Sequence, residues 1–254
     1  NKHKGKILEN PDNSLSQFYI RTNNIKGMGI GTIKGDKKIN AILALNTDIS
    51  ILTETRSDHS KIITLKNRLR SQLSGFTFYG TNSNLRGVTV MLKNSSGITF
   101  EGFQAIDNNT VKFTALLPDQ TKLSAICCYA PSDSDDPSYW ESVFEEFSTL
   151  EADYKFISGD FNVTLDPEMD TKGYLTDPHK KSRIPINAML EADIINDLYR
   201  DINPDKKAYT WRTQKGDKRA RLDYFMSTPA LSKVATDIRI QNNIWDISDH
   251  ASIV

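Results

Sequence analysis

The sequence holds only two cysteines among its 254 residues, and the two are neighbours, Cys127 and Cys128. Adjacent side chains on a strand face opposite sides, so this pair suits neither a disulfide framework nor a metal site. We therefore expect the chain to work in a reducing, intracellular compartment.

Long apolar runs are also absent, since no stretch reaches the roughly 18 residues that a membrane-spanning helix requires. The polar start at residues 1–6 (NKHKGK) has no apolar segment behind it, unlike a signal peptide. These absences predict a soluble protein with no signal peptide and no membrane partner. Residues 1–16 show no periodicity, and we expect an irregular lead-in there.

The chain has no net charge, which argues against a protein that coats nucleic acid through its total charge. The charges are unevenly distributed, however. Residues 206–221 hold seven basic side chains against one acid, Asp217, whereas residues 133–153 are acidic. The neutral total therefore hides a polarised molecule.

Apolar residues make up 38% of the sequence and charged residues 25%, a balance that is ordinary for a globular protein. No linker divides the chain, so we expect a single domain over residues 1–254. Strands and helices are predicted in an irregular alternation. Two packed sheets flanked by helices fit this alternation better than one doubly wound parallel sheet.

The predicted elements follow from apolar periodicity and from turn and cap residues. Strands are expected at residues 18–22, 48–53, 76–79, 87–92, 98–103, 111–117, 123–129, 156–157 and 238–240. Helices are expected after caps at Asp36 and Asp58, at residues 139–150 and 186–195, and in a short turn near Leu231. Residues 166–181 are predicted to be a polar loop, and residues 209–212 and 221–226 a hairpin.

Residues 155–162 (KFISGDFN) form the stretch around which the chemistry is predicted. A short apolar run with strand character is broken at once by Ser158 and Gly159. Asp160 would then leave the sheet at a cleft, where its carboxylate can accept a proton from water. Asn162 points to the same side if the extended conformation continues, so its amide can donate to the oxygen under attack. The alternative is a simple turn.

Polar or acidic residues stand at predicted strand ends in five separate places. They are Asn24, Glu54, Asp160 with Asn162, Asp223, and Asp249 with His250. One such residue is unremarkable. Five of them spread over the whole chain predict a single cleft that is assembled from loops along one edge.

With Tyr129 added, the order and local sequence of these residues resemble the endonuclease/exonuclease/phosphatase superfamily. The matching pieces are residues 24–27 (NIKG), 53–55 (TET), 129–131 (YAP), 159–162 (GDFN), 221–224 (RLDY) and 248–250 (SDH). Within the superfamily, residues 209–211 (YTW) and the basic hairpin look most like the apurinic-type endonuclease domain of a non-LTR (LINE-type) retrotransposon. The resemblance implies an α/β fold of two packed mixed β-sheets flanked by helices, the four-layer, DNase I-like sandwich.

The resemblance also implies a magnesium site, with Mn²⁺ as a substitute. Glu54 would be the Mg²⁺ ligand, Asn24 would help to hold the metal or its water, and Asp249 would be a further metal-side carboxylate. Magnesium usually keeps several waters, so a lone glutamate suffices. Taken alone, Glu54 could equally be a surface acid that leads a helix. Lys26, where relatives carry Asn or an acidic residue, argues against a second metal on that side.

The tripeptide Ser-Asp-His occurs twice, at residues 57–59 and 248–250. His59 fits a capped helix start, whereas His250 precedes a strand-like tail, as in the family. The resemblance implies that His250 contacts the phosphate and is oriented by Asp223, and that the Tyr129 hydroxyl faces the scissile phosphate. A carboxylate partner favours a protonated imidazole, which stabilises developing phosphate charge.

The predicted function is a Mg²⁺-dependent endonuclease that nicks double-stranded DNA by in-line attack of water. The resemblance implies 3′-hydroxyl and 5′-phosphate ends, with the former priming reverse transcription, and also a nuclear site of action and a larger reverse-transcriptase polyprotein. Three rivals are open: an abasic-site repair endonuclease, a phosphatase of the same superfamily, and a catalytically silent nucleic-acid-binding module.

The basic hairpin is expected to choose the DNA by following phosphates or entering a minor groove. The residues expected to contact DNA are Thr210, Arg212, Lys215, Lys218, Arg219 and Arg221. The alternative is a solvated basic loop.

Overall fold

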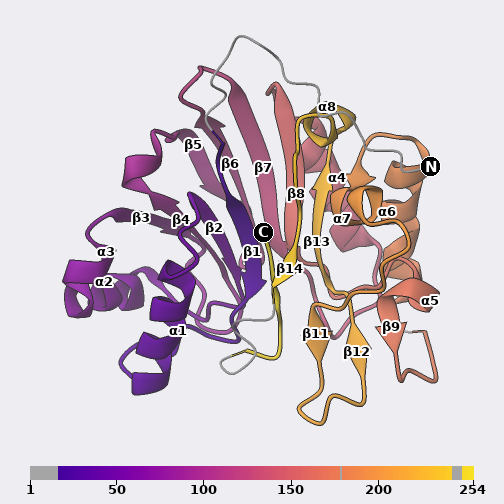
Figure 1. Cartoon of the computed structure of the whole chain (residues 1–254), viewed down its shortest axis with the longest axis horizontal. Coiled ribbons are helices and arrows are strands. Elements are labelled where there is room, and N and C mark those ends of the chain that lie inside the picture. The colour runs from indigo at the N-terminus through magenta and orange to yellow at the C-terminus, as the bar shows by residue number, and fades with distance from the viewer. Residues whose placement is uncertain (1–16, 178, 242–247) are drawn as a thin grey trace, which may run out of the picture.

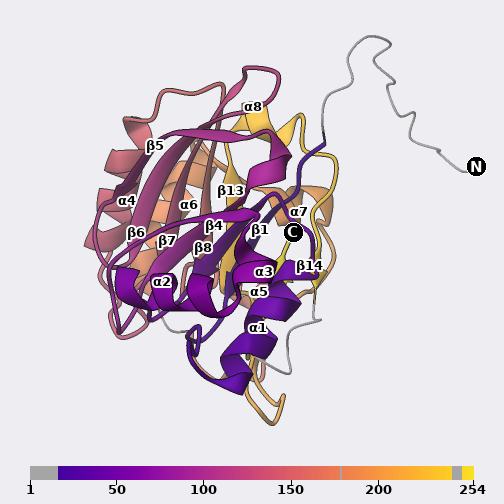
Figure 2. The ribbon, with the colours of Figure 1, turned by 90° about the vertical axis from the view of Figure 1, so that its left-hand side faces the viewer.

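The computed structural model describes residues 17–177, 179–241 and 248–254, so the irregular lead-in expected at residues 1–16 lies outside the described residues. Two six-stranded mixed sheets pack face to face, with helices on both outer faces (Figure 1, Figure 2). The predicted α/β sandwich is therefore confirmed. In the described part of the chain, no helix has the length and apolar character needed to cross a membrane.

The first sheet brings both ends of the described chain together. In spatial order its strands are β14 (Ile240–Gln241), β15 (Ser252–Ile253), β1 (Ile20–Asn24), β2 (Ile49–Thr53), β4 (Val88–Lys93) and β3 (Phe76–Gly80). Its outer face is covered by α1 (Ile33–Leu43), α2 (His59–Arg68) and α3 (Arg70–Leu73). Leu52 of β2 faces this side because alternate strand residues face opposite sides of a sheet. Ile39 and Ile42 of α1 pack against it.

The second sheet carries the predicted central strand. In spatial order its strands are β10 (Asn196–Asp197), β13 (Asp223–Ser227), β8 (Tyr154–Asp160), β7 (Lys122–Tyr129), β6 (Thr110–Leu116) and β5 (Thr99–Ala105). Helices α4 (Ser138–Ser148) and α6 (Lys180–Glu191) cover its outer face through a cluster that includes Trp140 and Ile186.

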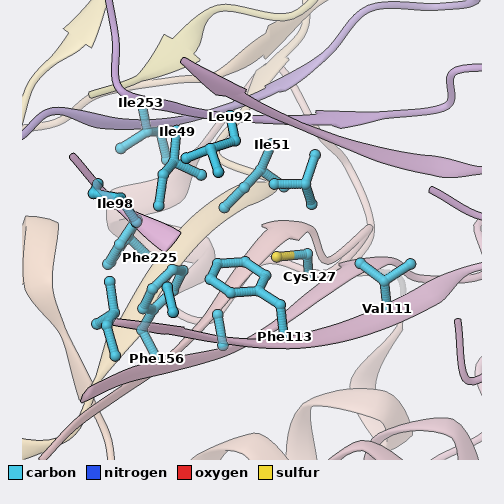
Figure 3. Packing of buried hydrophobic residues seen from close by; sticks show 14 of the residues in the cluster. Ile49, Ile51, Leu92, Ile98, Val111, Phe113, Cys127, Phe156, Phe225 and Ile253 are labelled. Atoms are coloured by element: carbon cyan, nitrogen blue, oxygen red, sulfur yellow. The ribbon is translucent and has the colours of Figure 1, made fainter. Parts of the chain in front are cut away.

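The main core lies between the two sheets (Figure 3). Ile49 and Ile51 of β2 meet Phe156 of β8 and Phe225 of β13, and these two rings stack with centroids 4.5 Å apart. Cys127 of β7 faces this core, whereas its neighbour Cys128 belongs to the cluster under α4. Both thiols are fully buried and unpaired.

A third, small sheet projects from one end of the sandwich (Figure 1). Its order is β11 (Trp211–Arg212), β12 (Arg219–Ala220) and β9 (Thr171–Lys172). We call these three strands and the turn at residues 213–218 the finger. The predicted hairpin is thus only partly right, because residues 223–226 belong to β13 of the second sheet, and β11 pairs with β12 instead.

Several predicted boundaries are wrong for local reasons. Thr32, not Asp36, caps α1, since its side chain accepts from the Gly35 N–H. The predicted polar loop at residues 166–181 contains α5 (Pro167–Asp170) and β9. Helix α6 begins at Lys180, six residues before the predicted start, and includes Pro185. The short elements η1 (Asn94–Ser96), α7 (Leu198–Ile202) and α8 (Pro229–Ser232) complete the set.

Candidate active site

Three neighbouring strands of the second sheet place polar side chains in one row. Tyr129 ends β7, Asp160 ends β8 and Asp223 begins β13, and both Tyr129 and Asp223 are register partners of Asp160. Strand alternation turns all three toward the first sheet, on the face that also carries Phe156 and Phe225. The row therefore stands at the edge of the core between the sheets.

The strand break predicted at Ser158 and Gly159 is wrong, because β8 runs on to Asp160. Gly159 permits this with a φ of +141°, and a Cβ at this position would lie 1.9 Å from the carbonyl oxygen of Cys128. Only glycine fits so close an approach between β7 and β8. As a result Asp160 is held inside the sheet and is only 1% exposed.

The first sheet contributes an amide and a second carboxylate to the same place. Asn24 ends β1, and its Nδ2 donates to Asp160 Oδ2 at 2.8 Å and to Glu54 Oε2 at 3.0 Å. Glu54 directly follows β2 with a φ of +52°, and its other oxygen forms an ion pair with Arg56. One amide group thus joins a carboxylate from each sheet.

His250 completes the cluster from the C-terminal segment. Its Nδ1 lies 2.8 Å from Asp223 Oδ2, and its Nε2 lies 3.9 Å from Asp160 Oδ2. Ser248 secures this segment to β1 by donating from Oγ to the Asn24 carbonyl at 2.7 Å. The other copy of the tripeptide behaves as predicted, since Asp58 caps α2 and His59 is exposed at its start.

Three groups of the site have raised pKa values. Burial raises the pKa of Asp160 to about 7, and the charge of Asp223 adds to this effect while His250 opposes it. Burial by itself would lower the pKa of His250, but Asp223 and Asp160 outweigh it and raise the pKa to about 9. Burial and the charges of Glu54 and Asp160 also raise the pKa of the half-buried Tyr129. At neutral pH the cluster therefore combines a poised carboxyl group with a cationic imidazole.

Asn162 is placed differently from the prediction. Its φ is +50°, so the extended conformation does not continue past Asp160. Its side-chain Nδ2 donates to the Ala130 carbonyl at 2.7 Å, while its backbone N–H donates to Asp160 Oδ1 at 3.0 Å. Asn162 thus reaches Asp160 through the main chain.

Asp249 is paired with a lysine. Its Oδ2 accepts from Lys26 Nζ at 2.8 Å. Burial by itself would raise the pKa of Asp249, but the Lys26 bond and the His250 charge hold it below the usual value. The role of Asp249 as a metal-side carboxylate stays a prediction.

The donor set fits a hard divalent cation. Carboxylate oxygens of Glu54 and Asp160 converge on one amide, and Asp223 Oδ1 is buried without a partner among the described residues. Oxygen ligands of this kind suit Mg²⁺. Asp160, Asp223 and His250 form a second possible cation site, since one ligand atom from each lies within 4.8 Å of the others.

Two residues expected to contact DNA are buried. Arg221 is 1% exposed and binds both Asp170 and Asp197, and Thr210 is 0% exposed, with its Oγ1 accepting from the Asp223 N–H. Their assignment to DNA contact is wrong, because both are enclosed within the fold. The other four lie on the finger, with Lys215 and Lys218 exposed and Arg212 and Arg219 partly buried.

Sequence reasoning missed two charged residues beside the site, Arg56 and Lys38. Lys38 is 5% exposed and donates from Nζ to three main-chain carbonyls near Asn24. A signal for it existed, since Lys38 shares a helix face with Ile42 four residues later and should therefore be buried. Nothing in the local sequence pairs Arg56 with Glu54.

Comparison with known proteins supplies structural neighbours. No family model matches the sequence, and no curated protein matches it. An AP endonuclease from Leishmania major shares 16% identity, with a TM-score of 0.71 over 93% of this chain and 86% of that one. A 3′ phosphatase from Neisseria, bound to a product DNA hairpin, shares 18% identity, with a TM-score of 0.70 over 93% and 98%.

An AP endonuclease from Archaeoglobus fulgidus is similar to the same degree, with 18% identity and a TM-score of 0.67 over 93% of this chain and 98% of that one. These neighbours belong to the AP endonuclease/exonuclease/phosphatase superfamily. At such low identity they establish the fold that this chain shares with them.

Proposed function

We propose that this chain is a Mg²⁺-dependent endonuclease that hydrolyses phosphodiester bonds of double-stranded DNA. The observation that carries the proposal is the convergence of Asn24, Glu54, Asp160, Asp223 and His250 from five separate parts of the chain at one edge of the two sheets. The neighbours include AP endonucleases and a 3′ phosphatase bound to DNA, which supports a DNA phosphoester as the substrate.

Asp160 is the general base in this proposal. Its carboxylate is fixed by Asn24 and by the Asn162 N–H, and a pKa of about 7 suits a group that accepts a proton from water near neutral pH. The water oxygen forms a bond to phosphorus as its proton passes to Asp160, and the P–O3′ bond breaks. The O3′ atom leaves with the electron pair of that bond and takes a proton from solvent, so the products are a 3′-hydroxyl and a 5′-phosphate.

His250 stabilises the charge that develops on the phosphoryl oxygens. Asp223 binds its Nδ1 and thereby directs Nε2 toward the Asp160 side of the site. A cationic ring in a buried site stabilises such charge more strongly than it would in water. Tyr129, one strand away from Asp160, is proposed to donate a hydrogen bond from its hydroxyl to the same phosphate.

Glu54 would hold Mg²⁺, with Mn²⁺ able to substitute, and Asn24, whose Nδ2 donates to Glu54, would help to hold the metal by orienting that ligand or a water of the metal. When bound, the metal would supply Lewis-acid stabilisation of phosphate and leaving-group charge. Asp249 is proposed as a further carboxylate on that side.

The biological role proposed is nicking of a target site in the nucleus, within a larger reverse-transcriptase polyprotein. The exposed lysines of the finger support DNA contact beside the site. A second candidate is repair of abasic sites, which is favoured by the AP endonucleases among the structural neighbours.

One assay tests the proposal and separates the two candidates. The full chain is incubated with intact supercoiled plasmid and with a duplex that contains one abasic site, each with Mg²⁺ or with a chelator. A target-nicking enzyme cuts the intact plasmid, whereas a repair enzyme cuts only the abasic duplex. Extension of the nick by a DNA polymerase reports the 3′-hydroxyl. If neither substrate is cut with Mg²⁺ or Mn²⁺, the proposal fails.

A further inference from the structure

Lys38 of α1 binds three consecutive carbonyl groups. Its Nζ donates to the oxygens of Ile25 at 2.6 Å, Lys26 at 3.1 Å and Gly27 at 2.8 Å. Consecutive carbonyls of an extended chain point in alternate directions. Here they point to one place because Lys26 and Gly27 have φ values of +49° and +80°. The ammonium group has three N–H donors, and the turn at residues 24–27 occupies all of them.

The same turn is joined on its other edge to the segment that carries Glu54. The Gly27 N–H donates to the Glu54 carbonyl at 2.7 Å, and the Met28 N–H donates to the Thr55 carbonyl at 2.9 Å. The turn therefore lies between Lys38 on one edge and the Glu54 segment on the other.

The turn also fixes the orientation of the Asn24 side chain. Asn24 Oδ1 accepts from the Lys26 N–H at 2.9 Å, which directs Nδ2 toward Glu54 and Asp160. If the left-handed curl at Lys26 relaxes, that N–H moves and the amide loses its constraint. The shape of the turn is thus coupled to the two carboxylates of the site.

We propose that Lys38 is a positioning residue, whose ammonium group holds the turn at residues 24–27 in the shape that presents Asn24 to Glu54 and Asp160. Its relevance to catalysis rests on the proposed function. Lys38 does not touch the substrate, because it is 5% exposed and all three of its donors are used within the fold.

The test compares Lys38→Met with Ile42→Ala. The first variant keeps a long apolar side chain but removes every donor. The second removes a buried side chain from the same face of α1 and controls for lost stability. Burial is the main cause that lowers the pKa of Lys38 to about 8, so all measurements are made below that pH.

Hydrogen exchange is the first readout, and it does not depend on activity. We expect the Gly27 and Met28 amides to exchange at least roughly 10-fold faster in Lys38→Met, since unpaired carbonyls destabilise the turn. These amides should stay near their wild-type rates in Ile42→Ala. Equal exchange at the turn in wild type and Lys38→Met would overturn the proposal.

Nicking and metal binding are the second readout. A misplaced Asn24 should slow single-turnover nicking by roughly 10-fold to 100-fold, the usual effect of small displacements in a site. The Mn²⁺ concentration for half-saturation, followed by electron paramagnetic resonance, should rise several-fold. The DNA concentration for half-saturation should stay unchanged. A loss of rate no larger than in Ile42→Ala would leave Lys38 with a purely structural role and overturn the proposal.

Two further variants keep the proposal testable if Lys38→Met does not fold. Lys38→Arg keeps a cation with several donors, and Lys38→Gln keeps two donors without charge. Exchange at the turn should increase in the order wild type, Arg, Gln, and any other order contradicts the proposal. If the wild-type chain does not nick DNA at all, the proposed function fails, while exchange and Mn²⁺ binding still decide the role of Lys38.

Discussion

Two clusters of buried charge lie on either side of β13, and they are built in opposite ways. At its start, Asp223 and Asp160 share one imidazole, His250, and Asp223 Oδ1 has no partner among the described residues. Two residues earlier in the chain, Arg221 binds Asp170 and Asp197 through four hydrogen bonds of 2.6–3.0 Å. The first cluster has unused acceptor capacity, and the second has its charges fully paired.

The difference separates buried charges that can take part in catalysis from buried charges that only stabilise the fold. Tyr224 also closes the Arg221 cluster, because its hydroxyl donates to the Arg221 carbonyl and the guanidinium lies 4.5 Å from its ring centroid. Burial alone would lower the pKa of Arg221, but Tyr224 and Asp197 raise it well above the usual value. The Arg221 guanidinium therefore keeps its proton near neutral pH, whereas the pKa of Asp160 is about 7.

The largest expected effect is on activity, from Asp160→Asn. Loss of a general base should slow nicking by roughly 10² to 10⁴-fold. The free energy of unfolding should not fall, because the variant removes a buried carboxyl group whose ionisation burial disfavours. Plasmid nicking and thermal unfolding of the same preparation check both parts. Wild-type nicking by this variant would remove Asp160 from the mechanism.

The second effect is on stability, from Arg221→Met. Removing the cation leaves Asp197 without its ion-pair partner and Asp170 with Arg200 alone, which should cost about 3–5 kcal/mol of unfolding free energy. Urea denaturation measures this loss. Nicking per folded molecule should stay within a few-fold of wild type at low temperature. A stable variant without activity would reverse the roles of the two clusters.

The third effect concerns pH. Folding raises the pKa of His250 from 6.5 to about 9, so its bound proton contributes stability in full below pH 6.5 and loses that contribution as the pH rises through 9. The unfolding free energy of the wild type should therefore fall between these values. His250→Gln should flatten this decline, while Arg221→Met should keep it. Equal slopes in all three proteins would contradict the raised pKa.

The smallest expected effect is on DNA affinity, from Lys218→Ala combined with Arg219→Ala. Each lost phosphate contact removes about one unit from the slope of log affinity against log salt concentration. The rate at saturating DNA should hold, because the finger lies outside the Asp160 cluster. Lys233→Ala, at the end of α8 on the opposite side of the molecule, is the control (Figure 1). An unchanged slope in the double variant would leave the finger as ordinary surface.

Much of the sandwich could be predicted because its strands carry their own signal. The apolar stretches that form β2, β4, β6 and β7, and the turn and helix-cap residues between elements, are local features of the sequence. The paired two-residue strands of the finger were missed or misplaced, because β9 and β12 exist only through pairing between segments 47 residues apart, as between Lys172 and Arg219.

The candidate site was predicted better than the surroundings of each charge. Asp160, Asp223 and His250 meet as their strand-end positions indicated. Arg221 was misassigned because a basic residue in a basic stretch is indistinguishable in sequence from a surface residue. Its partners lie 51 and 24 positions away, and only the fold brings them together. The backbone at Asn162 was missed for the same reason, since a positive φ in a non-glycine residue depends on tertiary support.

The two cysteines lie just before Tyr129, the last residue of β7, and their reactivity would report whether the sheet opens there. Cys127 and Cys128 face opposite layers, and burial raises the pKa of both thiols, so neither reacts while β7 is paired on both sides. A thiol reagent should therefore modify them only when at least one of the two apolar layers that cover β7 separates from this strand. Unequal labelling of the two positions would tell which of the two apolar layers separates first.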